Sequence, residues 1–206
     1  MKEKPTSRDL QARETRQKLL DAAMDLIAGE GYASATISRI CKAAGGSVGT
    51  FYSYFDSKRE IVALMSRKRN EEIYEAAQTL DFSKPARQVY LDYVRLTMEH
   101  IKRLGYIHAR AILEGMMEVP DVGGLNHGIQ LRQESIRRIL EHGCTTGEFS
   151  TERISKDDFY WLYSAAFHGS LALWCFRDGQ LDIVEDGLQK LGPLVGLLTV
   201  SPSPAI

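Results

Sequence analysis

Residues 36–60 read TISRICKAAGGSVGTFYSYFDSKRE, and this stretch decides how the N-terminal third folds. Apolar residues recur at helical spacing over 37–44, behind Thr36 as a predicted N-cap. Two glycines then allow a tight turn, and Ser47 is placed to cap a second short helix over 48–54. Two short helices joined in this way have the dimensions of a helix-turn-helix.

The second short helix is predicted to have an apolar face and a hydroxyl-rich face. Phe51 and Phe55 lie four residues apart and are expected to point inward with Ile37 and Ile40. Hydroxyls suit phosphate oxygens and base edges, and the free N–H groups at the start of the helix favour an anion. Lys58 follows one turn later, within reach of a phosphate. The outward, hydroxyl-bearing residues are Ser47, Thr50, Tyr52, Ser53 and Tyr54.

Residues 45–49 also match G-x-S-x-G, the pattern around the nucleophile of many serine hydrolases. That nucleophile needs a strand before the serine, whereas an amphipathic helix is predicted before Ser47. The chain has no H-E-x-x-H, P-loop or G-x-G-x-x-G pattern, and its five histidines lack paired spacing. We therefore expect no metal site, no cofactor and no enzymatic activity, and we keep a hydrolase that uses Ser47 as the alternative.

The remainder of the 206 residues predicts an all-α fold. Hydrophobic residues make up 44% and charged residues 26%, and no alternating strand pattern is present. Ser57 and Glu60 form a predicted capping box that opens a long helix. The expected helices cover about 8–30, 37–44, 48–54, 57–79, 85–104, 106–117, 128–145, 156–177 and 183–198.

Charge is divided unevenly along the chain. Residues 1–70 carry 13 Lys and Arg against 8 Asp and Glu, a net charge of +5, whereas residues 71–206 carry 13 against 19, a net charge of −6. A basic first third is expected to face a polyanion. Three dispersed cysteines, no signal peptide and no long apolar run predict a cytoplasmic protein that does not enter a membrane.

At this point a resemblance becomes specific. The quoted stretch, with a Leu-Asp-Ala-Ala and a Gly-Tyr pattern before it, closely resembles the DNA-binding signature of TetR-family transcriptional regulators over roughly residues 13–72. Its most diagnostic part runs from Gly49 to Phe55 and includes Lys58.

The resemblance implies a definite division of the chain. Residues 1–56 are expected to form a three-helix, helix-turn-helix DNA-binding domain. A long helix joins it to a helical ligand-binding and dimerisation domain over 57–200, and residues 201–206 are expected to be a flexible tail.

The resemblance also implies which residues contact DNA. Val48 stands where relatives often carry a lysine, and its methyl groups suit a thymine methyl; Gly46 replaces a common valine. The predicted DNA-binding residues are Thr36, Ser47, Val48, Gly49, Thr50, Tyr52, Ser53, Tyr54 and Lys58.

Residues 159–176 carry large and small apolar side chains almost all round the expected helix, which predicts burial on several sides. The resemblance implies that the last two long helices pair with those of a second subunit, and we expect Trp174 at this seam. It also implies an effector pocket among the middle helices. Candidate lining residues, aromatic and thioether with a few polar points, are His100, Tyr106, His108, Met116, Met117, Trp161, Phe167 and His168.

These expectations describe a homodimeric repressor that binds a palindromic operator in double-stranded DNA and is released by a small hydrophobic or aromatic effector. The residues leave activation open in place of repression. A protein-interaction module of the same fold that no longer binds DNA is a further alternative.

Overall fold

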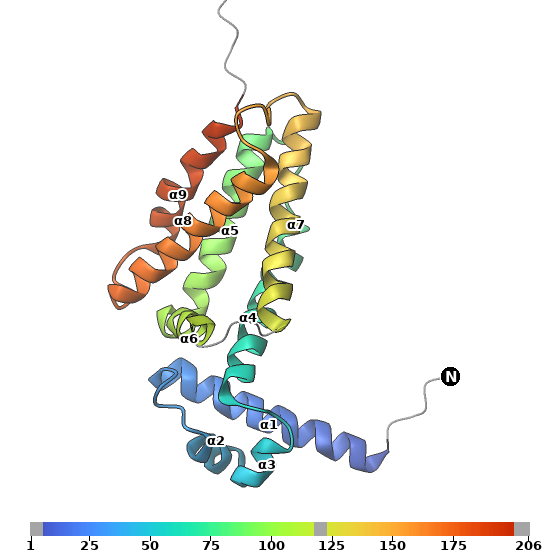
Figure 1. The fold of residues 1–206 in the computed structure, drawn as a ribbon, viewed down its shortest axis with the longest axis vertical. Helices are drawn as coiled ribbons and strands as arrows, with labels where there is room; N and C mark the ends of the chain where they lie inside the picture. Colours follow the sequence, from blue (N-terminus) through green and yellow to red (C-terminus); the bar gives the residue numbers. More distant parts are fainter. Residues whose placement is uncertain (1–5, 118–122, 200–206) are drawn as a thin grey trace, which may run out of the picture.

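The computed structural model describes residues 6–117 and 123–199, and the side chains of residues 6–115 and 127–199 among them. Its helices form a small unit at one end and a taller bundle at the other, with α4 running between them (Figure 1). We call α1 to α3 with the start of α4 the head, and the remaining helices the bundle. In the described residues no strand forms, and Phe149 and Thr199 make a single antiparallel bridge.

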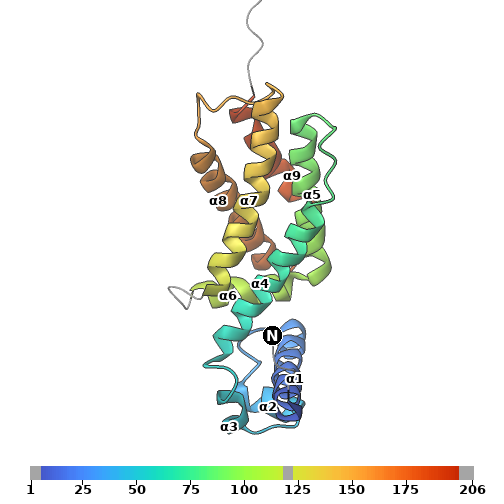
Figure 2. The ribbon, with the colours of Figure 1, turned by 90° about the vertical axis from the view of Figure 1, so that its right-hand side faces the viewer.

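The fold is therefore all-α, as predicted. The head contains α1 (Ser7–Glu30), α2 (Ile37–Ala44) and α3 (Val48–Tyr52), and α4 (Lys58–Ala77) leads out of it. The bundle contains α5 (Ala86–Leu104), α6 (Tyr106–Met117), α7 (Gly123–Thr145), α8 (Lys156–Phe176), α9 (Ile183–Leu191) and the 3₁₀ helix η1 (Gly192–Leu197). A second view shows α6 lying across the lower end of the bundle, next to the head (Figure 2).

The helix-turn-helix forms because its sequence supplies a cap at each helix end. The Thr36 side chain accepts a hydrogen bond from the Arg39 N–H, and the Ser47 side chain accepts one from the Thr50 N–H. Between them, Gly45 ends α2 in the left-handed conformation, at φ +69°. The Gly46 N–H then donates to the Cys41 carbonyl at 2.8 Å, which satisfies the end of α2.

A side chain at position 45 should therefore destabilise the protein. We expect Gly45→Ala to lower the free energy of unfolding by about 1–2 kcal/mol, because a Cβ disfavours the left-handed conformation. Urea denaturation followed by circular dichroism measures the change. Gly46→Ala is the control: its Cβ would lie 3.8 Å from Thr50 side-chain atoms, an ordinary contact. Equal losses for the two variants would contradict this explanation.

Two apolar cores hold the molecule together, and α4 contributes to both. The head core gathers Phe51 and Phe55 with residues of α1, α2 and the first half of α4. It also takes in Ala111 and Ile112 of α6, so the bundle is packed directly against the head. The bundle core is formed mainly by the facing sides of α5, α7, α8 and α9. The domain boundary expected at residue 56 stays a prediction.

Several helix ends differ from those expected, and local chemistry explains why. The Ser57 side chain makes no cap bond; instead Glu60 accepts from the Asp56 N–H at 3.0 Å, so the predicted capping box was wrong. The helix α3 ends at Tyr52 rather than at 54, and α7 begins at Gly123 rather than at 128. The expected helix 183–198 changes to 3₁₀ form at Gly192, which is followed by a proline.

Candidate nucleic-acid interface and effector region

The exposed side of α3 lies at the end of the molecule farthest from the bundle (Figure 1). Phe51 is fully buried beneath it, whereas Tyr52 is 56% exposed and Val48 is 45% exposed. Gly49 is exposed on the same short helix, and Ser53 is exposed directly after its end. The predicted division into an inward apolar face and an outward face is therefore confirmed for these residues.

The hydroxyls at the start of α3 are organised by one another. Ser47 Oγ accepts from the Thr50 N–H at 3.1 Å and lies 2.9 Å from Thr50 Oγ1. Ser47 is exposed and Thr50 is half-buried, so both hydroxyls are held in place near solvent. Ser47 thus caps a helix and follows another helix, and the strand that a nucleophilic serine in this pattern requires is replaced by α2.

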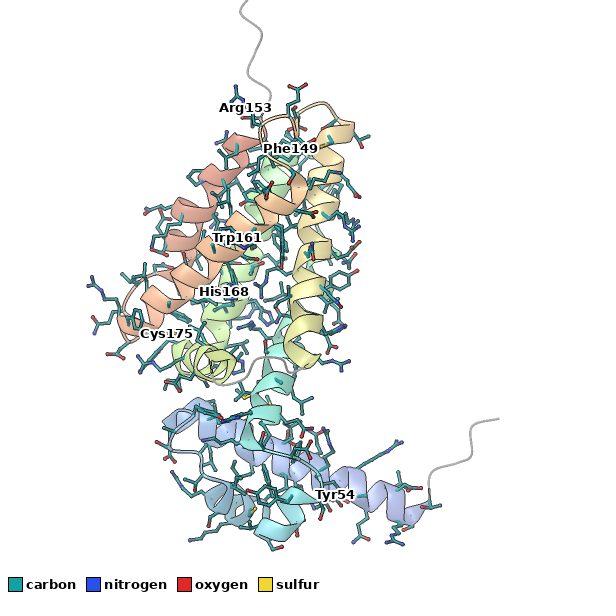
Figure 3. All side chains as sticks on the ribbon, in the orientation of Figure 1. Tyr54, Phe149, Arg153, Trp161, His168 and Cys175 are labelled. Atoms are coloured by element: carbon teal, nitrogen blue, oxygen red, sulfur yellow. The ribbon has the colours of Figure 1, made fainter. Side chains whose placement is uncertain are left out.

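Three more of the predicted DNA contacts differ from one another in exposure and in their contacts within the head. Thr36 is exposed at the start of α2. Tyr54 is half-buried and packs against the head core (labelled in Figure 3). The Lys58 ammonium donates to the Tyr32 carbonyl and lies 3.8 Å from the centre of the Tyr32 ring. Lys58 therefore also supports the head, and its role toward phosphate stays a prediction.

Arginines along α1 add positive charge beside this face. Arg8 and Arg13 are exposed. Arg16 is held over the Phe55 ring at 4.8 Å and lies 3.8 Å from the Glu60 carboxylate. Lys2 and Lys4, which also belong to the basic first third of the chain, lie outside the described residues.

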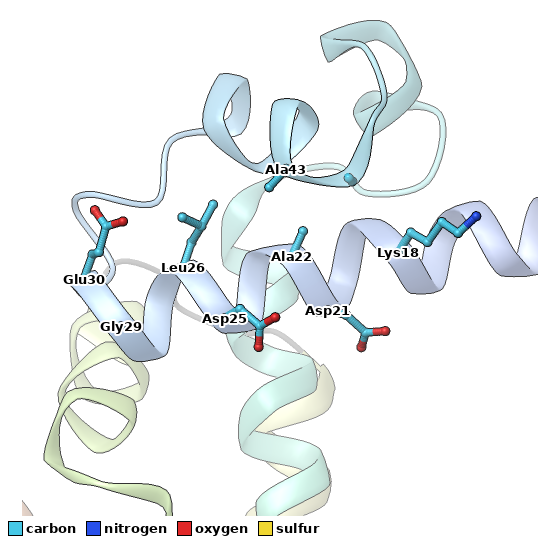
Figure 4. A pocket seen from close by; sticks show the side chains of 9 residues that line it. Lys18, Asp21, Ala22, Asp25, Leu26, Gly29, Glu30 and Ala43 are labelled. Carbon is cyan, nitrogen blue, oxygen red and sulfur yellow. The ribbon is translucent and has the colours of Figure 1, made fainter.

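A groove of about 500 Å³ runs between α1 and α2 and has the opposite character (Figure 4). Three carboxylates line it, those of Asp21, Asp25 and Glu30, against the single ammonium of Lys18. Negative charge repels phosphate, so this groove is not a surface for DNA. The candidate interface is the exposed side of α3 with the start of α2.

The expected effector residues are only partly brought together. His100, His108 and Phe167 are buried, and His168 is half-buried beside the Phe167 ring, whose centre is 5.2 Å away. Tyr106 is half-buried and packs edge-on against the Trp174 ring at 6.4 Å. Trp161 is 69% exposed. The side chains of Met116 and Met117 lie outside the described residues.

Two buried arginines stand in the same region, and sequence reasoning missed them. Arg69 of α4 is 4% exposed and Arg132 of α7 is 6% exposed. The Arg132 guanidinium lies 4.2 Å from the centre of the Phe167 ring and donates to Asn70 Oδ1 at 3.2 Å. The signal was present: Arg69 stands four residues after Met65 and four before Ile73, both of which face the core.

Two of the histidines near these arginines, His108 and His168, are neutral. Burial, followed by the charge of Arg69, lowers the pKa of His108 to about 4. Burial, followed by Arg132, lowers the pKa of His168 to about 4 as well. Neutral His168 donates from Nδ1 to the Ser164 carbonyl at 2.8 Å, which leaves its Nε2 as an acceptor. The region thus combines fixed positive charge with neutral imidazoles.

The helix α8 has a buried face and an exposed face, and its aromatic residues are divided between them differently from our expectation. Trp174 is only 4% exposed and packs in the bundle core with Phe167 and Leu171, so its placement at a subunit seam was wrong. The positions three, four and seven residues apart share a helix face, and Trp174 falls on the inner one. Phe176, at 79% exposure, lies on the outer face with Trp161, which is 69% exposed and is labelled in Figure 3.

Within the described residues, no helix is both long and apolar enough to cross a membrane. The same part of the chain holds no group of three or more His, Cys, Asp or Glu side chains placed to bind a metal ion.

Comparison with known proteins agrees with this architecture. The family model described as "Bacterial regulatory proteins, tetR family" matches residues 19–65, the part that builds most of the head. The HTH-type transcriptional regulator SrpR of Pseudomonas putida is 26% identical over 143 residues, which are 67% of this chain and 65% of that protein. The match therefore spans slightly less than two thirds of SrpR.

Solved structures extend the likeness over nearly the whole chain. FadR of Thermus thermophilus, in complex with lauroyl-CoA, superposes with a TM-score of 0.71 at 20% identity, covering 93% of this chain and 98% of that one. FadR of Bacillus subtilis, in complex with stearoyl-CoA, gives a TM-score of 0.70 at 20% identity, covering 87% and 97%. These similarities show a shared fold. Together with the family match over residues 19–65, they show that the chain resembles TetR-family bacterial regulatory proteins, in the sequence of its head and in its overall fold.

Proposed function

We propose that this protein is a dimeric repressor of transcription that binds a palindromic operator and is released by a small effector with a hydrophobic body. One observation carries the proposal: the exposed, hydroxyl-bearing side of α3 is held at the tip of the head by Phe51 beneath it and by the Ser47 cap. The family match to the head supports this reading. The acyl-CoA complexes of the two FadR proteins support an effector within the helical bundle.

The outer face of α8 supports a dimer. Trp161, Leu173 and Phe176 are exposed on it, and Ala165 and Gly169 are exposed small residues between them. A Cβ at Gly169 would meet no other atom within 4 Å, so this face is open. Large apolar side chains separated by small ones allow two helices to approach closely. A second copy of the chain is the partner that a two-fold operator requires.

The helix α6 supports a route from effector to DNA. His108 lies in the buried region near Arg69, and Ala111 and Ile112, one turn later, belong to the head core. A Cβ at Gly115 would lie 2.6 Å from Val62 Cγ1, so α6 packs tightly on α4. A shift of α6 in the bundle therefore displaces the base of the head. A coupling free energy on the order of 1–3 kcal/mol is sufficient for release from DNA.

The direct test is fluorescence anisotropy of the full chain against the duplex upstream of its own gene and a scrambled duplex, across a salt series. We expect tighter binding to the native duplex and an affinity that falls steeply with salt, because phosphate contacts release counterions. Equal, weak binding to both duplexes and to genomic fragments would support the protein-interaction module instead.

Tyr52→Phe tests the assignment of the interface. Its hydroxyl is expected to donate to a phosphate, and a hydrogen bond to a charged group is worth about 1.5–3 kcal/mol, so the affinity for every duplex should fall about tenfold or more. Tyr74→Phe, on α4 outside the head, is the matched control and should bind as the wild type does. A changed base preference with little loss of affinity would show that Tyr52 reads bases.

A further inference from the structure

Arg69 and Arg132, which we call the arginine pair, lie inside the bundle without an acidic partner among the described residues. None of the described carboxylates forms an ion pair with either guanidinium, and the nearby acids of α4 face other groups. Glu71 pairs with Arg67 at 2.8 Å, and Glu72 lies 3.1 Å from His100. A buried cation without a counter-charge is strongly unfavourable, so this arrangement calls for an anion from elsewhere.

Hydrogen-bond donors are left unused around the same point. Nε and Nη1 of Arg69 and Nη1 of Arg132 are buried and make no hydrogen bond. Native proteins rarely leave buried donors in such a state unless the site has a role. Two neighbouring groups of the bundle also make no hydrogen bond: the Tyr163 hydroxyl, near Arg132, and Nε2 of His108, near Arg69.

The positive charges of Arg69 and Arg132 lie close enough to affect one another. Burial, and then the positive charge of Arg132, lowers the pKa of Arg69 to about 9. The Arg69 guanidinium therefore remains charged at neutral pH, and His108 and His168 do not add further charge because they are neutral. The region thus gathers two guanidiniums and two neutral imidazoles with the buried aromatic side chains of Phe167 and Tyr163.

We propose that the arginine pair is an anion-binding site, and that the effector is a small molecule with one carboxylate on an aromatic or aliphatic body. The planar fork of an arginine matches a carboxylate with two parallel hydrogen bonds. The aromatic surroundings suit an apolar body and exclude water. This inference rests on the proposed function and specifies the chemistry of its effector. It also gives α6 a reason to move, since His108 stands beside Arg69.

The test titrates the full-length protein calorimetrically with benzoate, 4-phenylbutyrate and decanoate, each paired with its methyl ester. We expect at least one acid to bind and its ester to bind at least tenfold more weakly, because the ester lacks the negative charge. Decyl phosphate, run beside decanoate, asks whether the site prefers a carboxylate over another anion. Failure of all three acids to bind, or equal binding of acid and ester, would overturn the proposal.

Variants locate the site. Arg69→Met and Arg132→Met should each weaken binding of the acid at least tenfold and abolish its preference over the ester. Arg138→Met is the control, since that guanidinium lies on the same helix as Arg132 but is exposed over the Phe82 ring. Unchanged binding in both buried variants would refute the assignment. Arg69→Lys, which keeps a charge without the fork, should bind with intermediate affinity.

The melting temperature of the ligand-free protein separates a binding role from a structural one. If the role of Arg69 is to bind an anion, Arg69→Met removes an unpaired buried charge from the ligand-free protein and should raise its Tm. A structural arginine would lower Tm when replaced, and that result would count against the proposal. DNA binding is measured on the same samples: intact DNA binding without acid binding rejects only the anion site, whereas loss of specific DNA binding in the wild type rejects the proposed function itself.

Discussion

Phe176→Glu should leave the protein monomeric and should sharply weaken its binding to a palindromic duplex. Phe176 is 79% exposed at the end of α8, and Trp161, at 69%, lies fifteen residues earlier on the same outer face. That spacing corresponds to about 22 Å of helix, long enough to pair with a second copy. Two-fold symmetry introduces the charge twice, so a loss of about 2 kcal/mol per side amounts to roughly 10³-fold in the dimer dissociation constant.

Sedimentation velocity over a concentration series measures this change. Leu10→Glu is the matched control, because Leu10 is an exposed apolar residue on α1, 54% exposed and away from α8. It should leave the dimer intact. A dimer of wild-type affinity in Phe176→Glu would show that another face of the bundle joins the subunits.

Phe51→Ala should unfold the head while the bundle stays folded. Phe51 is fully buried, and its ring centre lies 5.6 Å from that of Tyr52 and 5.5 Å from that of Phe55. Replacing such a phenylalanine costs about 3–5 kcal/mol. The effect on α3 is severe because a five-residue helix has little stability of its own and depends on this contact.

Thermal denaturation by circular dichroism should then show an early transition for the head, and specific DNA binding should be lost at a temperature where the dimer persists. Val48→Ala, on the exposed side of the same helix, should change the free energy of unfolding by no more than about 0.5 kcal/mol. A single cooperative transition in Phe51→Ala would show that head and bundle unfold together through α4 and α6.

In the head, the local sequence predicted the caps of both short helices. Thr36 and Ser47 were identified as caps from residue type and spacing alone, and both accept the expected hydrogen bonds. Such interactions join residues that are three or four positions apart, so the sequence is sufficient to predict them. The capping box expected at Ser57 failed for a related reason: Glu60 had a competing N–H, that of Asp56, equally close in sequence.

In the bundle, the local sequence did not predict which side of a helix is buried. Hydrophobic periodicity predicted a buried helix at α8, but it did not separate Trp174, which the subunit buries in its own core, from Trp161 and Phe176, which it leaves exposed. Nearly every position of this helix is apolar, so its rotation about its axis depends on which neighbours it meets. Those neighbours, α5 and α9 among them, come from distant parts of the chain.

The sequence by itself determined an all-helical chain, a helix-turn-helix with its caps and its left-handed glycine, and the resemblance of its first third to TetR-family regulators. Each of these depends on interactions within a few residues. Only the tertiary structure decided which face of α8 stays open, and that Arg69 and Arg132, 63 positions apart, share one buried region in which no described carboxylate pairs with them. Burial and charge compensation are properties of groups that meet through folding, and no local pattern contains them.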